Sequence, residues 1–321
     1  GMTSLRESGV SPTELVPSME HVRCNLCGAD EARVRIPSTL KSRPREDWNA
    51  YACTSGGYGC HGPIVACQRC GFVYADPRPY GTEVLDIYEA VEDPLYVEER
   101  EGRVLTFEHH LRPLERVTGP AQGRRLLDVG AHTGVFVDIA MRHGWDAWGV
   151  EPSTWAVEQA RAQGLQMHLG TLENVTFPAG HFSVVTMWDV IEHVPDPFRT
   201  LQAAWRALES DGLLVVHTMD IDSLFSRLMG RRWPWYMEMH LFYFSRHTLS
   251  AMLNRAGFRV LWMGAQGRYL QAGYLASRVA ALSSLVGQPL ERLVTWLKLR
   301  ELALRINLGD LFTTYAQKVD N

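Results

Sequence analysis

The chain of 321 residues is 46% hydrophobic and 21% charged, and it carries a formal net charge of -4 at pH 7. This length and composition allow a full α/β core together with one small extra lobe. The slightly acidic balance argues against a nucleic acid as the main partner, and the apolar runs are too short or too charged to span a bilayer.

The start of the chain, residues 1–20, is polar, and Gly1 before Met2 is typical of a cleaved tag. We expect this segment to be mobile. Because the sequence shows no secretory signal, we expect a cytoplasmic protein. The sequence leaves the oligomeric state open.

Two Cys-x-x-Cys-Gly motifs follow, Cys24 with Cys27 and Cys67 with Cys70. The glycine after each pair lets backbone amides turn toward the thiolates, and four thiolates make a closed tetrahedral zinc site. We therefore predict a zinc-ribbon-like lobe over residues 21–76, held together by a structural Zn²⁺ ion. The alternative, two reducible disulfides, is less expected without a secretory signal.

The 39 residues between Cys27 and Cys67 contain Cys53, Cys60 and His61. These three could form a second metal site or a redox pair, but we favour an accessory loop with free or paired thiols. The run Asp-Pro-Arg-Pro at 76–79 marks the end of the lobe, and residues 77–119 are predicted to be a helical connector.

Residues 124–152 predict a strand, a glycine turn, a helix and a second strand. The first strand stops at Gly130 and Gly134, and the second ends in Glu151. In such a βαβ unit the turn lets a ligand approach the backbone, and a carboxylate after the second strand can accept hydrogen bonds from both ribose hydroxyls of an adenosine-containing cofactor.

The turn, Asp128-x-Gly130-x-His132-x-Gly134, lacks the G-x-G-x-x-G pattern of nicotinamide-binding units. It resembles motif I of the class I S-adenosylmethionine-dependent methyltransferases, D/E-x-G-x-G-x-G, with His132 in place of the middle glycine. The resemblance implies that the methionine end of the cofactor lies against the turn and that Glu151 holds the ribose. A glycine-rich turn without a ligand is the alternative.

Strands and helices alternate through the rest of the chain, which predicts a mostly parallel sheet with ligands at its carboxyl edge. FSVVTMWDVIEHVPDP, followed by DGLLVV, resembles the post-I region and motif IV of the same family. A sixth strand at 258–262 and a closing strand at 309–318 fit the family's antiparallel last strand. For residues 120–321 we thus expect an α/β, Rossmann-like, seven-stranded methyltransferase sheet.

An insertion at about 272–306 separates the last two strands and predicts two amphipathic helices, interrupted by Gly287 and Pro289. We expect this C-terminal helical insertion to pack on the sheet or on a partner subunit. A lid or a peripheral membrane contact through its arginines and lysines is the alternative.

The whole pattern resembles a bacterial group of class I methyltransferases with an N-terminal C-x-x-C zinc lobe, which act in glycan, nucleotide-sugar or natural-product pathways. Its most distinctive part is GRRWPWY at 230–236 followed by HLFYFS at 240–245. The resemblance implies a small-molecule, sugar or glycan acceptor. Two alternatives stay open: an RNA methyltransferase whose zinc lobe grips RNA, and a non-catalytic module that keeps the cofactor fold.

The cofactor is expected to contact residues of the turn and of the strand ends, namely Asp128, Gly130, Ala131, His132, Gly134, Glu151, Pro152, Leu172, Glu173 and Asp189. For proton removal an imidazole suits neutral pH, and His193 and His240 are the candidates, with Tyr236 as a hydroxyl partner. Alternatively, His193 caps the next helix and His240 packs among aromatic residues. The aromatic residues at 233–244 form either a stacking wall for a sugar ring or a buried hinge.

Overall fold

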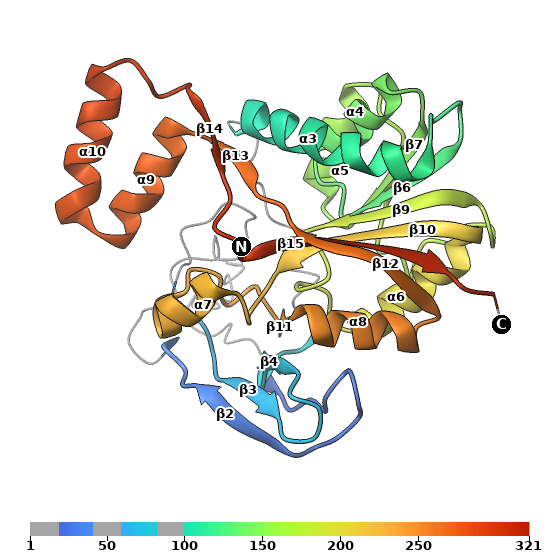
Figure 1. The fold of residues 1–321 in the computed structure, drawn as a ribbon, viewed down its shortest axis with the longest axis horizontal. Coiled ribbons are helices and arrows are strands. Elements are labelled where there is room, and N and C mark those ends of the chain that lie inside the picture. Colours follow the sequence, from blue (N-terminus) through green and yellow to red (C-terminus); the bar gives the residue numbers. More distant parts are fainter. Residues whose placement is uncertain (1–18, 41–58, 82–98, 321) are drawn as a thin grey trace, which may run out of the picture.

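The computed structural model describes residues 19–40, 59–81 and 99–320 (Figure 1). Its centre is a seven-stranded sheet in the order β12-β15-β10-β9-β6-β7-β8. The strands are β6 (Arg125–Val129), β7 (Asp146–Glu151), β8 (Met167–Leu169), β9 (Phe182–Trp188), β10 (Leu208–Met219), β12 (Phe258–Ala265) and β15 (Leu311–Lys318). Only β15 runs antiparallel to its neighbours in this sheet, which confirms the predicted methyltransferase topology.

Helices cover both faces of the sheet, as its buried strands require. The helices α3 (Arg100–Thr118), α4 (Val135–Arg142) and α5 (Thr154–Ala162) share one core cluster on the first face. On the opposite face lie α6 (Pro197–Ala207) and α8 (Arg246–Arg255). Serine side chains cap α5 and α8, where Ser153 accepts from the amide of Ala156 and Ser245 forms a capping box with Thr248.

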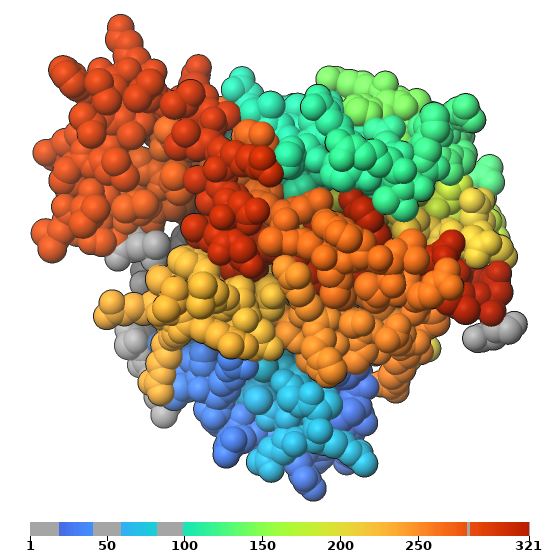
Figure 2. Space-filling view, in the orientation of Figure 1, coloured from blue at the N-terminus to red at the C-terminus, as the bar shows by residue number. Residues whose placement is uncertain are grey.

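The N-terminal lobe is joined to the methyltransferase fold by a shared sheet. Its strands β2 (Ala32–Ile36), β3 (Ile64–Cys67) and β4 (Val73–Ala75) are extended by β11 (Phe242–Tyr243), which pairs with β4. The ring of Phe72 stacks on Phe242 at 5.7 Å and lies 5.0 Å from Phe244. The lobe therefore lies on the side of the large sheet that α6 and α8 cover (Figures 1 and 2), and its residues share the hydrophobic core on that side.

Two expectations for the ends of the lobe need correction. Met19 and Glu20, expected to be mobile, form strand β1 (Met19–Glu20), which pairs with β5 (Arg78–Pro79). The predicted helical connector is thus a strand at its start and the helix α3 at its end. Residues 1–18 and 82–98, together with Cys53, lie outside the described residues.

A second small sheet, not expected from the sequence, lies on α3. The strands β13 (Arg268–Gln271) and β14 (Ala303–Ile306) pair antiparallel, so the last residues of the predicted helical insertion are extended. The Tyr269 amide donates to the Thr106 hydroxyl at 2.8 Å, and a Cβ on Gly102 would lie 2.9 Å from the Tyr269 carbonyl oxygen. This close contact fixes the hairpin on the helix.

The two predicted helices of the insertion are α9 (Ala272–Leu282) and α10 (Ser284–Trp296), and the chain turns between them at Ser283 rather than at Gly287 and Pro289. A Cβ on Gly287 would lie 2.0 Å from the Cα of Ala280, so this glycine permits close packing of the pair. The helices extend to the side of the sheet instead of covering it (Figure 1), and Leu285 and Trp296 are 88% and 77% exposed. In the described part of the chain, none of the helices combines the length and apolarity needed to cross a membrane.

Candidate active site

A cavity of about 500 Å³ opens at the carboxyl edge of the parallel strands. Its walls come from the ends of β6, β7, β9 and β10, from one side of α3, and from the hairpin strand β13. This volume lies within the range of roughly 300–1,000 Å³ that ligand pockets usually have. The cavity is therefore large enough for a cofactor beside a small acceptor.

The glycine turn after β6 forms one end of this cavity. Gly130 has a φ of +66°, and a Cβ there would lie 2.6 Å from a methyl group of Val190. His132, at the middle glycine's place, adopts a φ of +50° and donates its amide to Glu151 Oε1 at 3.0 Å. Its ring lies edge-on to Trp155 and forms part of the cavity wall, while burial lowers the pKa of this imidazole to about 3. With His132 at the position of the family's middle glycine, the chain still forms the turn, and an uncharged imidazole becomes part of the cavity wall.

The carboxylate of Glu151 organises the turn from behind. Its second oxygen accepts the amide of Ser153 at 2.7 Å, and the side chain is fully buried. Asp128 is also buried, where its Oδ1 accepts from the Thr186 hydroxyl at 2.8 Å, and burial raises the pKa of this carboxyl to about 8. The predicted cofactor residues thus fall into two groups. Gly130, His132, Pro152, Leu172, Glu173 and Asp189 line the cavity, whereas Asp128, Ala131, Gly134 and Glu151 are not among the described lining residues.

In the wall of the same cavity the structure brings His193 and His240 together, with ring centroids 4.7 Å apart. The Nδ1 atom of His193 lies 3.0 Å from the Met239 carbonyl oxygen, and that of His240 lies 2.6 Å from the Trp235 carbonyl oxygen. Because a carbonyl only accepts, each Nδ1 carries a hydrogen, and in the neutral ring each Nε2 is an acceptor. Burial lowers the pKa of both imidazoles, which favours the neutral form.

Neither alternative for these histidines describes their surroundings fully. Asp196, not His193, caps α6 by accepting from the Arg199 amide at 3.1 Å. His240 does pack among aromatic rings, 6.2 Å from Trp235, yet it also lines the cavity. Beside the two rings lies Glu192, a residue the sequence had not singled out, with its Oε1 atom 3.8 Å from His193 Nε2.

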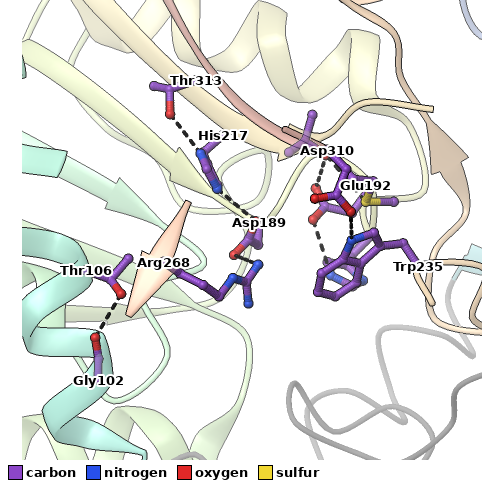
Figure 3. A network of polar contacts seen from close by, with 12 residues as sticks. Gly102, Thr106, Asp189, Glu192, His217, Trp235, Arg268, Asp310 and Thr313 are labelled. Atoms are coloured by element: carbon purple, nitrogen blue, oxygen red, sulfur yellow. Dashed lines mark hydrogen bonds and ion pairs between the residues drawn. The ribbon is translucent and has the colours of Figure 1, made fainter. Parts of the chain in front are cut away.

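A second polar network, also missed by the sequence, links Asp189 to His217 and Arg268 (Figure 3). The Asp189 carboxylate oxygens lie 3.8 Å from His217 Nε2 and 3.6 Å from an Arg268 nitrogen. His217 Nδ1 bonds the Thr313 hydroxyl at 2.8 Å, and that hydroxyl donates to Gln266 at 2.7 Å. His217 thus presents an acceptor Nε2 toward Asp189, and burial lowers its pKa to about 4. A histidine at the end of an otherwise apolar strand was the signal that could have revealed it.

The aromatic loop after β10 is mostly core. Trp233 and Trp235 both donate their indole N–H groups to Asp310 Oδ2, at 3.0 and 2.8 Å, and only Trp235 lines the cavity. Tyr236 packs 5.3 Å from the rings of Trp233 and Tyr243 and is not among the described residues of the cavity wall. Most aromatic side chains of this loop are therefore buried in the core, and Trp235 is the one of these three that faces the cavity.

The four motif cysteines converge in the N-terminal lobe. One sulfur from each lies within 4.8 Å of the others, with Cys24 and Cys70 at 3.5 Å and Cys27 and Cys67 at 3.6 Å. A tetrahedron with Zn–S bonds of about 2.3 Å has sulfur separations of about 3.8 Å, so this donor set fits a structural zinc ion. Burial raises the pKa of Cys24 and of Cys70, whereas the amides of Cys70 and Arg69 outweigh burial at Cys67 and lower its pKa to about 7, so Cys67 is the member of this cluster that ionises most readily of the three.

The remaining described cysteine and its neighbour do not join that cluster. Cys60 is a free thiol of intermediate exposure. The ring of the buried His61 bonds through Nδ1 to the carbonyl oxygen of Gly62 at 2.7 Å. Because Cys53 lies outside the described residues, the accessory loop with free or paired thiols stays a prediction.

Comparisons with known proteins agree with the fold. The chain is similar over 124 residues to the "Ubiquinone biosynthesis O-methyltransferase" of Bordetella avium, with 28% identity, covering 35% of this chain and 52% of that protein. The Psychrobacter arcticus protein of the same name is 32% identical over 107 residues, and the match covers 30% of this chain and 42% of that protein. The chain thus spans about half the length, or less, of these curated relatives.

Two solved structures are also similar. A possible histamine N-methyltransferase of Thermotoga maritima has a TM-score of 0.45 and 22% identity, covering 68% of this chain and 91% of that one. A complex of the Haloferax volcanii Trm112 methyltransferase activator with the putative methyltransferase has a TM-score of 0.49 and 15% identity. The match covers 69% of this chain and 93% of that one. The family model described as "Methyltransferase domain" matches residues 96–262, more than half of the chain. The chain belongs to this methyltransferase family, and its glycine turn and strand order are those of a class I S-adenosylmethionine-dependent methyltransferase domain.

Proposed function

We propose that the protein transfers a methyl group from S-adenosylmethionine to a hydroxyl oxygen of a small-molecule acceptor, with sugars and glycans within that class. The observation that carries this proposal is one cavity whose lining includes both the glycine turn and His193, His217 and His240. The name of the curated relatives, O-methyltransferases, supports a hydroxyl acceptor.

For the cofactor, the residues of the turn fit the proposed role. S-adenosylmethionine supplies a methyl group that is already activated on a sulfonium. Gly130 leaves the backbone accessible, and Pro152 and Leu172 give an apolar wall. The buried Glu151 accepts from the amides of His132 and Ser153, so it fixes the turn that the ribose of the cofactor would approach. Asp128, Ala131 and Gly134 shape the turn, while Glu173 and Asp189 line the cavity.

For the acceptor, the chain must position a hydroxyl and take its proton. His193 and His240 each turn an acceptor Nε2 away from a backbone carbonyl, and His217 does the same toward Asp189. A neutral imidazole is a suitable base near pH 7. Tyr236 acts indirectly in this proposal, since it packs against Trp233 and supports the loop that carries His240.

We also propose that residues 21–76 form a structural zinc lobe, residues 77–119 a connector and residues 120–321 the methyltransferase domain. The lobe contributes to the common core through Phe72, which contacts Phe242 and Phe244. This packing supports a structural role for the lobe over the RNA-binding alternative.

The proposal is tested in two steps. Calorimetry with S-adenosylhomocysteine should show binding by the wild-type chain and weaker binding by Glu151→Gln, with Glu209→Gln as an exposed control. A radiolabelled methyl donor is then offered with catechols, simple sugars and nucleotide sugars. A folded chain that binds no cofactor analogue refutes the proposal, and transfer only to nitrogen or carbon acceptors refutes the hydroxyl chemistry.

A further inference from the structure

Three side chains in the wall of the cavity bring possible metal-ligand atoms close to one another. Glu192, His193 and His240 each offer one ligand atom, and these atoms all lie within 4.8 Å of one another. Glu192 is 2% exposed and His240 is 5% exposed, and all three line the cavity. A carboxyl oxygen and two imidazole nitrogens are donor atoms of the kind that first-row transition-metal ions bind.

Each of the three side chains is also held in orientation by a second group. The Met239 carbonyl accepts from His193 Nδ1 at 3.0 Å, and the Trp235 carbonyl accepts from His240 Nδ1 at 2.6 Å. The Thr218 hydroxyl donates to Glu192 Oε2 at 2.9 Å, which leaves Oε1 facing His193. Metal-binding histidines and carboxylates are commonly oriented in this way by outer hydrogen bonds.

The partners of Glu192 support the same conclusion. Among the described residues, Glu192 has one ion-pair contact, the 3.8 Å separation from His193, which is too long for a hydrogen bond. The nearest arginine of the cavity network, Arg268, is paired with Asp189 at 3.6 Å. A hydrogen bond between Glu192 Oε1 and His193 Nε2 would need a shorter distance. A metal ion bound by both atoms is compatible with the observed distance.

We propose that Glu192, His193 and His240 bind a divalent first-row transition-metal ion whose open positions face the cavity and take the acceptor's hydroxyl oxygen. Two imidazoles and one carboxylate suit such ions and leave coordination sites open, in contrast to the closed four-thiolate site in the lobe. The role of the ion rests on the proposed function, but its binding does not. The ion lowers the pKa of the acceptor hydroxyl as a Lewis acid.

The bonds and charges of the assisted transfer balance. The O–H bond breaks, and its proton goes to the neutral Nε2 of His217. The oxygen forms a bond to the methyl carbon, while the bond from that carbon to sulfur breaks and leaves its electron pair on sulfur. The products are a methyl ether and a neutral thioether, and the imidazolium then returns its proton to water. His193 and His240 act as ligands in this scheme, so His217 is the base.

The test uses the full chain, freed of loosely bound metal by chelation, and Mn²⁺ as the probe, because thiolates disfavour this ion. Electron paramagnetic resonance should detect one bound Mn²⁺ per chain without any cofactor. Glu192→Gln, His193→Gln and His240→Gln should each weaken binding by about tenfold or more. His217→Gln, in the same cavity, and His168→Gln, outside it, should keep the wild-type affinity. Circular dichroism checks folding.

If the ligand variants fail to fold, Co²⁺ bound to the wild-type chain decides. A second equivalent whose spectrum lacks thiolate charge-transfer bands supports the site, and a spectrum from the thiolate site alone overturns it. A folded wild-type chain that binds no Mn²⁺ at millimolar concentration also overturns it. Methyl transfer at an undiminished rate in excess chelator refutes the role of the ion only, whereas metal binding without binding of S-adenosylhomocysteine refutes the proposed function only.

Discussion

Replacing Asp310 should separate the two tryptophan anchors of the aromatic loop from the sheet. Its Oδ2 atom accepts both indole N–H groups, from Trp233 at 3.0 Å and from Trp235 at 2.8 Å, and the carboxylate is 4% exposed. A buried donor that loses a charged partner costs about 2–3 kcal/mol, and the half-buried Trp235, which can reach water, costs about 1 kcal/mol. Asp310→Ala should therefore lower the free energy of unfolding by about 3–4 kcal/mol.

The Asn variant at this position makes the prediction sharper. Asp310→Asn keeps an oxygen acceptor at nearly the same place and loses only the charge, so about half of that loss is expected. Asp222→Ala, an exposed carboxylate two residues after Asp220, should change stability by less than about 0.5 kcal/mol. Urea unfolding followed by tryptophan fluorescence measures all three. A loss below about 1 kcal/mol for Asp310→Ala, or equal losses for the Ala and Asn variants, would refute the anchoring argument.

Three further outcomes follow from buried groups. The pKa of Asp128 is raised from 3.8 to about 8, so between these values the folded state retains a proton that the unfolded state has lost. The free energy of unfolding should therefore fall as the pH rises from about 4 to 8. In Asp128→Asn, the urea midpoints measured over this pH range should fall less steeply than in the wild-type chain. Cys67→Ser should release zinc in a colorimetric chelator assay and lower the melting temperature, while Cys60→Ser, outside the cluster, should do neither. Gly134→Ala, with φ +82° and a Cβ 2.6 Å from Leu165 Cδ1, should cost about 2–4 kcal/mol in urea unfolding, and Leu165→Ala in the same chain should recover part of the strain.

The architecture was predictable because its signals are local. Strand β9 is a mostly apolar run without a charged residue, and glycines at 130 and 134 mark the turn after β6. The antiparallel place of β15 came from the family resemblance, since no local pattern tells which neighbour a strand will choose. The hairpin of β13 and β14 was missed because its pairing depends on contacts with α3, such as the hydrogen bond from Tyr269 to Thr106.

The candidate site was predicted in part for the same reason. His193 and His240 were chosen as single residues with suitable chemistry, and the fold brings them together from separate loops. Glu192 was not recognised as their neighbour because its burial depends on packing from β10 and the aromatic loop. Tyr236 has a suitable hydroxyl too, but its side chain is buried in the core. Only the three-dimensional structure shows this burial.

Because of the position of β15, the segment that matches the family model and the segment that forms the sheet are not the same. The stretch that matches the family model stops at residue 262, partway along β12, although β15 from beyond it lies between β10 and β12. A fragment cut at that residue would lose the strand that joins two others and would expose their open edges to self-association. The segment that matches the family model is therefore shorter than the segment that forms the complete sheet.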